Sequence, residues 1–343
     1  MSAAPSADLL EQTIPPPPLS PWPAGSLDDV LATDRVAIDI VLRGALDSDV
    51  ALIRRMAEYI IGSGGKRLRP ALVIMAARAC GYTGRSHYTL AAVVEMIHTA
   101  TLLHDDVVDE SDLRRGIATA NATFGNAASV LVGDFLYSRA FQLMVDVGSI
   151  RVLDILSNAT NVIAEGEVLQ LMNSGDPAVD EATYLAVIRR KTAKLFEAAA
   201  ELGATLGNAP PDAVQSLARY GMHLGTAFQL VDDVLDYSGE LSAIGKNLGD
   251  DLAEGKMTLP LIRAIAIGNT HDAALIRDAI TRGRLADFEP VRDVLARTGA
   301  LDYARECAER ESEAAARCVT GLPDSPDRRN LLELAAFAAH RTY

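Results

Sequence analysis

The 343-residue sequence has few cysteines, few aromatic residues and no excess of positive charge. Cys80, Cys307 and Cys318 are odd in number and widely spaced, which favours neither a disulfide framework nor a zinc site and makes a reducing cytoplasm the simplest compartment. Aromatic residues make up 5% of the chain, and strictly alternating β-branched runs are scarce, which argues against a β-sheet protein. The formal net charge of −14 argues against a nucleic-acid partner held by general charge attraction.

Long apolar runs are also missing. No run approaches the roughly 18 apolar residues of a membrane-spanning helix, and the chain does not open with the basic and then apolar segment of a secretion signal. We therefore expect neither a membrane span nor a secretion signal.

Seven of the 15 prolines precede residue 25. This composition predicts a disordered or polyproline arm over residues 1–25, with a docking motif for a proline-binding partner as the alternative, followed by one domain over 26–343.

From residue 26 onward, alanine and leucine are frequent, which predicts an all-α domain. We expect helices at about 27–46, 48–62, 68–81, 88–109, 121–145, 150–172, 180–206, 211–237, 255–268, 271–283, 288–318 in two pieces, and 325–340.

Two acidic clusters lie inside apolar helices, at 105–109 (DDVVD) and at 232–236 (DDVLD). Asp105 and Asp109 are about 40° apart on a helical wheel, so their carboxylates share a face. One such cluster could equally be a solvated face or an ion-pair network, but two copies favour bound cations. Hard oxygen ligands with few histidines select Mg²⁺ or Mn²⁺, and Mg²⁺ usually completes its coordination with phosphate oxygens and water. The clusters therefore predict a diphosphate bridged by metal ions.

Basic residues accompany these clusters. The segment 64–70 (GGKRLRP) places three cations after a glycine pair, where Lys66 and Arg69 can reach an anion. Arg114 reaches the side of Asp105 only if the helix ends between Asp109 and Arg114. The number of cations fits two diphosphates, one held through metals and one held directly by Lys and Arg.

The chain resembles the trans-isoprenyl diphosphate synthase family over nearly everything after the proline-rich arm. The motifs that carry the resemblance are GGKRLRP (64–70), HTATLLHDDVVDESDLRRG (98–116), KTAKLFEAA (191–199), GTAFQLVDDVLDY (225–237) and GKNLGDDLAEGKMTLPL (245–261). Met257 stands where many relatives have proline. The resemblance implies an isoprenoid-synthase-type helical bundle around a deep central cavity, usually as a homodimer.

The resemblance also implies roles for individual residues. The main ligands of two to three Mg²⁺ ions would be Asp105, Asp109 and Asp232, assisted by Asp106, Asp233 and Asp236. Isopentenyl diphosphate would be bound by Lys66, Arg69, His98 and Arg115. The allylic diphosphate, farnesyl or geranylgeranyl, would be held by Arg114, Lys191, Thr192, Gln229, Lys246 and Lys256.

Product length should depend on the residues just before the first cluster. Ala100 and Thr101 are too small to form a floor, and within the family an aromatic residue at either position is typical of short-product enzymes. We therefore expect an octaprenyl to decaprenyl product, of about C40 to C50, for a quinone side chain such as that of ubiquinone, made by a cytoplasmic enzyme with loose membrane association left open. Phe135, Leu136 and Met144 are candidates for the true floor of the cavity.

Four other hypotheses deserve comparison. A shorter-chain synthase and a non-catalytic subunit of a heteromeric synthase are the nearest. A metal-dependent phosphohydrolase could use the dyad of His104 and Asp105, but it leaves the second cluster unexplained. A terpene cyclase would need no isopentenyl diphosphate site.

Overall fold

The computed structural model describes residues 27–62, 67–114, 116–238 and 248–341. The proline-rich arm expected over 1–25 and the predicted binding residues Lys66, Arg115 and Lys246 lie outside the described residues.

The all-α expectation is confirmed, since the described residues contain helices and a single two-stranded hairpin, β1 (Leu113–Arg114) and β2 (Ile117–Ala118). The helices of the first half are α1 (Leu27–Leu46), α2 (Ala51–Gly62), α3 (Leu68–Ala79), α4 (Ser86–Val108), α5 (Ala120–Phe124), α6 (Asn126–Asp146) and α7 (Ile150–Asn173). The second half contains α8 (Glu181–Ile188), the π-helix η2 (Arg189–Ala193), α9 (Lys194–Leu206), α10 (Pro211–Ser238), α12 (Asp250–Ala253), α13 (Leu259–Ile267), α14 (Thr270–Arg282), the 3₁₀ turn η3 (Leu285–Asp287), α15 (Phe288–Thr298), α16 (Ala300–Cys318) and α17 (Pro326–His340).

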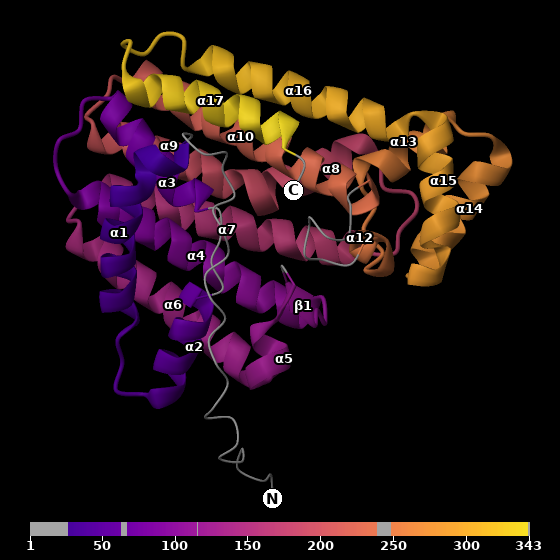
Figure 1. Cartoon of the computed structure of the whole chain (residues 1–343), viewed down its shortest axis with the longest axis horizontal. Coiled ribbons are helices and arrows are strands. Elements are labelled where there is room, and N and C mark those ends of the chain that lie inside the picture. The colour runs from indigo at the N-terminus through magenta and orange to yellow at the C-terminus, as the bar shows by residue number, and fades with distance from the viewer. Residues whose placement is uncertain (1–26, 63–66, 115, 239–247, 342–343) are drawn as a thin grey trace, which may run out of the picture.

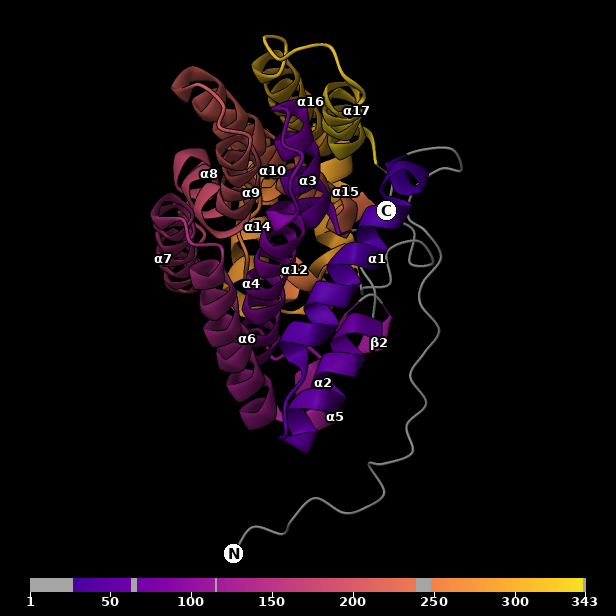
Figure 2. The same ribbon diagram turned by 90° about the vertical axis from the view of Figure 1, so that its left-hand side faces the viewer.

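The long helices run side by side in a bundle (Figure 1). Helices α16 and α17 cover one edge, where α16 packs along α10, while α13, α14 and α15 form a smaller group at one end. Helix α7 lies on the side of the bundle away from α1, with α3 and α4 between them (Figure 2). Buried aliphatic residues of α3, α4, α9 and α10 form the centre of the main core, so α4 and α10, which carry the two acidic clusters, are held by packing on several sides.

Three predicted helices differ from the structure, and three short elements were not expected. The segment expected as one helix over 121–145 is split at Gly125, whose φ of 88° suits glycine and ends α5 before α6 begins. The helix expected over 180–206 is interrupted by η2. The helix expected to begin at 255 begins at Leu259, because Gly255 adopts a positive φ and Pro260 stands in the first turn. The hairpin, α12 and η3 were not expected, as they are too short to show a period.

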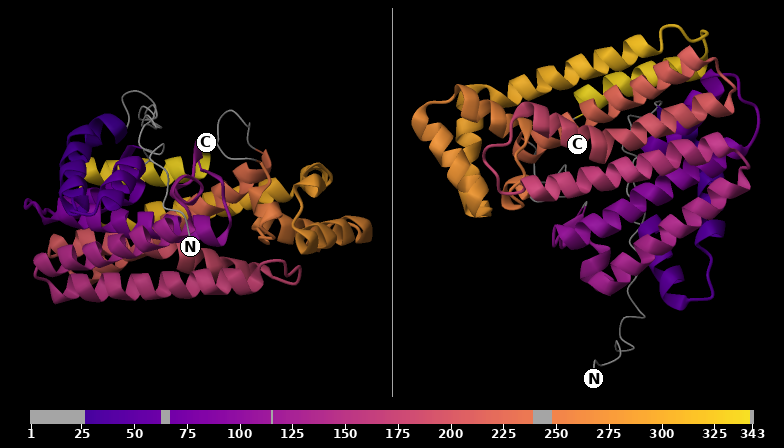
Figure 3. Two further views of the ribbon diagram at one scale, coloured as in Figure 1. Left: turned by 90° about the horizontal axis from the view of Figure 1, so that it is seen from below. Right: turned by 180° about the vertical axis from the view of Figure 1, so that it is seen from behind.

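Seen from below and from behind, α7 and α6 run along one face of the bundle (Figure 3). The two helices make only limited contact with each other, and this separation leaves room for the cavity described next.

Candidate active site

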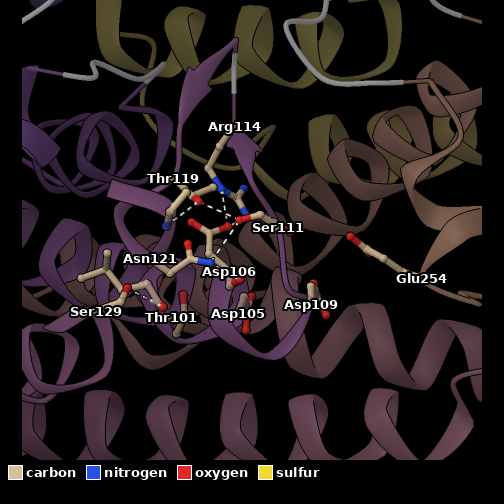
Figure 4. Close-up of polar contacts among 12 residues, drawn as sticks. Thr101, Asp105, Asp106, Asp109, Ser111, Arg114, Thr119, Asn121, Ser129 and Glu254 are labelled. Carbon is tan, nitrogen blue, oxygen red and sulfur yellow. Dashed lines mark hydrogen bonds and ion pairs between the residues drawn. The ribbon is translucent and has the colours of Figure 1, made fainter. Parts of the chain in front are cut away.

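A cavity of about 1150 Å³ lies between α4, α6 and α7. Asp105 on α4 and Asp109 just after α4 border it, together with Tyr137 and Phe141 from α6 and Glu167 from α7. Figure 4 shows the carboxylates of Asp105 and Asp109 side by side, while Asp106 turns away toward Arg114. The shared face predicted from the i, i+4 spacing is therefore confirmed as geometry.

Asp106 stabilises the C-terminal end of α4. Its Oδ1 accepts hydrogen bonds from Nε and Nη2 of Arg114 at 2.9 and 2.7 Å, and Asn121 donates to its backbone carbonyl at 3.0 Å. The helix break that the sequence required is present, since α4 ends at Val108, Glu110 has a φ of 50° and Arg114 returns on β1. Asp106 is 4% exposed, so this ion pair fixes the loop beside the cavity (Figure 4).

Lys191 reaches the first acidic cluster from the π-helix. Its Nζ lies 3.3 Å from Asp105 Oδ2 and 2.5 Å from Glu167 Oε2. Burial opposes the charge of Lys191, but Asp105 and Glu167 outweigh it and raise the pKa of the ammonium. Burial and the Asp105 carboxylate raise the pKa of Glu167 to about 7, against the opposite effect of Lys191.

Lys256 pairs with the other end of the same cluster. Its Nζ lies 2.9 Å from Asp109 Oδ2 and also forms an ion pair with Glu254. Burial disfavours the ammonium, but the carboxylates of Glu254 and Asp109 raise the pKa of Lys256 overall. Lys256 and Glu254 both border the cavity, so a second cation and a further carboxylate lie near Asp109. Figure 4 shows Glu254 on the side of Asp109 away from Asp105.

The second acidic cluster lies in a different environment. Asp233 is 2% exposed and accepts hydrogen bonds from the Tyr184 hydroxyl and from Gln229 Nε2, the latter at 2.8 Å. Thr192 donates to Gln229 Oε1 at 3.0 Å, which extends the network onto η2. Burial and the charge of Asp251 raise the pKa of Asp233 well above its usual range.

Asp232 is paired with a residue from the far end of the chain. Nη2 of Arg341, just after α17, lies 2.5 Å from Asp232 Oδ1 and donates to the Phe228 carbonyl at 2.8 Å, and the guanidinium stacks on the Phe228 ring. Arg341 is 2% exposed at its side chain, whereas Asp232 is 45% exposed. Asp236 is half-buried, and its backbone carbonyl accepts from the Gly249 amide at 3.2 Å.

The π-helix connects the two clusters. Its neighbouring residues Lys191 and Thr192 point to Asp105 and to Gln229, respectively. Two glycines allow this contact, because an added Cβ would lie 2.6 Å from the Lys191 backbone nitrogen at Gly166 of α7 and 2.6 Å from the Ala193 Cα at Gly225 of α10. π-Helical insertions are frequent at functional sites, since they shift side chains that a regular helix would point elsewhere.

The residues assigned to isopentenyl diphosphate are described only in part. Arg69 Nη1 lies 3.1 Å from His98 Nε2, and its guanidinium lies 4.2 Å from the centre of the Phe196 ring. The structure therefore brings Arg69 on α3 and His98 on α4 together, and their proposed ligand remains a prediction.

Thr101 borders the cavity, whereas Ala100 is fully buried in the core. Among the described residues that line the cavity, none of the three floor candidates Phe135, Leu136 and Met144 is found. The bulky side chains that α6 contributes to the lining are Tyr137 and Phe141. His104 Nε2 lies 3.2 Å from the Val130 carbonyl, and its ring stacks on Tyr137. This packing against α6 accounts for His104 without the phosphohydrolase dyad.

The donor chemistry of the first cluster fits a hard cation. Carboxylates of Asp105, Asp109, Glu167 and Glu254 face the cavity. Within the described part of the chain, no three acidic, histidine or cysteine side chains are close enough to surround a metal by themselves. A magnesium ion would therefore need substrate oxygens and water beside one or two carboxylates, which is its usual coordination in phosphate sites.

Sequence reasoning missed Glu167, Glu254, Tyr184 and Arg341. Glu254 lies two residues before Lys256, a predicted binding residue, and Glu167 follows a glycine in an apolar helix. The local sequence therefore gave a weak indication of both carboxylates. Tyr184 and Arg341 contact the second cluster from 49 and 109 residues away, and no local pattern could indicate those contacts.

Comparison with known proteins places the chain in a defined group. Residues 50–296 match the family model described as polyprenyl synthetase. The octaprenyl diphosphate synthase of Escherichia coli K12 is 52% identical over 316 residues, covering 92% of this chain and 98% of that protein. Within the described residues, no helix is long and apolar enough to cross a membrane.

Solved structures agree with the sequence comparison. A polyprenyl synthase from Caulobacter crescentus, crystallised with calcium and isoprenyl diphosphate, has a TM-score of 0.90 and 45% identity, covering 95% of this chain and 100% of that one. A decaprenyl diphosphate synthase from Rhodobacter capsulatus has a TM-score of 0.86 and 48% identity, covering 92% and 98%.

Proposed function

Since the chain belongs to the polyprenyl synthetase family and is a long-chain prenyltransferase, we propose that it extends an allylic diphosphate with isopentenyl diphosphate units, in the presence of Mg²⁺, to an all-trans product of about C40 to C50. Farnesyl or geranylgeranyl diphosphate is the proposed primer, and the side chain of ubiquinone is the proposed use. We assign the reaction to the cytoplasm on the basis of three unpaired cysteines.

One observation carries the proposal. Each of the three predicted metal ligands is paired with a basic residue from a different segment: Asp105 with Lys191, Asp109 with Lys256, and Asp232 with Arg341. Lys191 and Lys256 are also the residues assigned to the allylic diphosphate. A diphosphate and its cations can satisfy both members of these pairs, since the ammonium groups can donate to phosphate oxygens while the carboxylates bind the metal.

The residues suggest how the reaction proceeds. Bound Mg²⁺ would neutralise charge on the leaving diphosphate. Lys191 and Lys256 would donate to the same diphosphate as its allylic C–O bond breaks, which stabilises the negative charge where it develops. The double bond of isopentenyl diphosphate then attacks the allylic carbocation, and proton loss, with the released diphosphate as the acceptor, restores an allylic diphosphate. Thr192 and Gln229 contribute neutral dipoles beside the cation.

The cavity supports a long product. Thr101 lies about one helical turn before Asp105, where its small side chain leaves the passage open. We expect Thr101→Phe to shorten the product to about three or four isoprene units, because the ring would block the cavity one turn below the diphosphate. Ala100→Phe should shorten it similarly, but at a cost in stability since Ala100 is fully buried. Unchanged chromatographic profiles for both variants would contradict this placement.

We propose a homodimer through α6 and α7. Leu131 and Val145 on α6 and Met172 on α7 are apolar, more than half exposed and outside the cavity lining, while Val168 and Leu171 of α7 are exposed at the border of the cavity. Sedimentation velocity of the chain should give the mass of two copies, and Leu131→Glu should shift it toward one.

The direct experiment uses the purified chain with Mg²⁺, farnesyl diphosphate and labelled isopentenyl diphosphate. We expect labelled C40 to C50 products, at about eight to ten isoprene units, that disappear when a chelator removes the metal. Labelled products that stop at C20, one addition beyond the C15 primer, would indicate the shorter-chain synthase, and a chain inactive alone but active with a second subunit would indicate the non-catalytic role.

A further inference from the structure

Glu167 is the carboxylate closest to Lys191, and no motif or assigned role explains its presence. It lies on α7, borders the cavity, and places Oε2 2.5 Å from Lys191 Nζ, whereas Asp105 Oδ2 lies at 3.3 Å from the same nitrogen. Lys191 is therefore shared unequally between two carboxylates, and Glu167 is its principal partner.

The backbone fixes this arrangement. A Cβ at Gly166 would lie 2.6 Å from the Lys191 backbone nitrogen and 2.8 Å from the Arg190 Cβ, so α7 and η2 are in direct backbone contact one residue from Glu167. This close approach places the backbones of Glu167 and Lys191 next to each other, so their side chains extend from neighbouring positions. The Lys191 side chain is 18% exposed and that of Glu167 is 28% exposed, so water screens the ion pair only partly.

Removal of Glu167 would change the role of Asp105. Among the described residues, Asp105 and Glu167 are the carboxylates within ion-pair distance of Lys191. Without Glu167, the ammonium would turn fully to Asp105 and occupy the oxygens that a divalent cation needs. A partly buried lysine does not remain without a counter-ion when one is in reach.

We propose that Glu167 is a positioning residue that draws the Lys191 ammonium toward itself and so weakens its ion pair with Asp105, which lets Asp105 bind a divalent cation while Lys191 faces the diphosphate. This inference rests on the proposed function of Asp105 as a metal ligand and Lys191 as a diphosphate-binding residue. It assigns to Glu167 an effect that passes through Lys191, and no bond of Glu167 to the metal or the substrate.

The first test measures metal binding rather than activity. Mn²⁺ is titrated into the full chain with inorganic diphosphate present, and free Mn²⁺ is followed by electron paramagnetic resonance. We expect Glu167→Ala to weaken Mn²⁺ binding about tenfold, the usual effect of losing a residue that orients a metal ligand, and Glu167→Gln to weaken it less since its amide oxygen still accepts from Lys191. The matched control is Glu165→Ala, an exposed residue two positions earlier that contacts Asn161 and should leave binding unchanged.

The second test asks whether the effect passes through Lys191. In a Lys191→Met background there is no ammonium to restrain, so Glu167→Ala should leave Mn²⁺ affinity within about twofold. An equal loss of affinity in both backgrounds would overturn the proposal, because Glu167 would then act through its own charge or as a ligand. Unchanged affinity in the single variant would overturn it as well.

Kinetics provide a third readout. Glu167→Ala should raise the KM for the allylic diphosphate about tenfold and leave the KM for isopentenyl diphosphate unchanged, since Arg69 and His98 are on other helices. A merely structural defect would raise both constants. If the wild-type chain neither binds Mn²⁺ nor elongates a primer, the proposed function fails; if it does both and the variants behave like it, only the role of Glu167 fails.

Discussion

The two acidic clusters have nearly the same sequence and opposite environments. In the first, Asp105 and Asp109 face a cavity and are paired with two lysines that also have other carboxylate partners. In the second, Asp233 is enclosed by neutral donors, and Asp232 is paired with one buried arginine. From this comparison we propose that the carboxylates of the first cluster exchange their lysine partners for metal and diphosphate during the reaction, whereas Asp233 in the second cluster keeps fixed partners.

The largest expected effect concerns the first cluster. Asp105→Asn should lower kcat about a thousandfold, because several kcal/mol of charge stabilisation on the leaving diphosphate would be lost with a metal ligand. Steady-state assays with saturating Mg²⁺ measure this. Asp112→Asn is the control, since Asp112 is exposed and its side chain is outside the cavity lining. A loss of less than tenfold in Asp105→Asn would contradict the role of Asp105 as a metal ligand, and with it the functional difference between the two clusters.

Stability should show the reverse order. Asp233→Ala would leave the buried Tyr184 hydroxyl and Gln229 amide without their acceptor, so we expect the free energy of unfolding to fall by about 2 kcal/mol. Asp105→Ala should change it by less than about 0.5 kcal/mol, because Lys191 keeps Glu167 as its counter-ion. Urea denaturation followed by circular dichroism measures the free energy of unfolding of both variants. Equal losses in the two variants would mean that both clusters are structural.

The smallest effect concerns Arg341. Arg341→Met frees Asp232 from its ion pair, so the Mg²⁺ concentration for half-maximal activity should fall about threefold, within the range of a partly exposed pair. Arg329→Met, which breaks a surface pair with Asp324, is the control and should have no effect. A rise in the Mg²⁺ requirement would show that Arg341 orients Asp232 for the metal rather than competing with it.

The sequence predicted what depends on local periodicity. The spacing of Asp105 and Asp109 required a shared face, and the position of Arg114 required a helix break after Asp109; the structure has both. The periodic apolar residues also located most of the helices, and the motif resemblance predicted the family that the comparisons confirm.

Contacts between distant segments were not predictable. The contact between Glu167 and Lys191 depends on η2, a π-helical turn in a segment whose sequence looks like regular helix. It also depends on Gly166, which has no Cβ and so lets the backbones of α7 and η2 come together. Arg341 meets Asp232 across 109 residues of chain. Gly125 lies inside the helix expected over 121–145, although its positive φ ends one helix and starts the next. In each case tertiary packing selects one of several conformations that the local sequence pattern fits equally well.

The exchange of partners at the first cluster is tested most directly by anomalous diffraction at the manganese edge, from crystals grown with Mn²⁺ and inorganic diphosphate. We expect a manganese peak at bonding distance from carboxylate oxygens of Asp105 and Asp109, with the Lys191 and Lys256 ammonium groups on diphosphate oxygens. Manganese bound elsewhere, with both lysines still paired to Asp105 and Asp109, would contradict it.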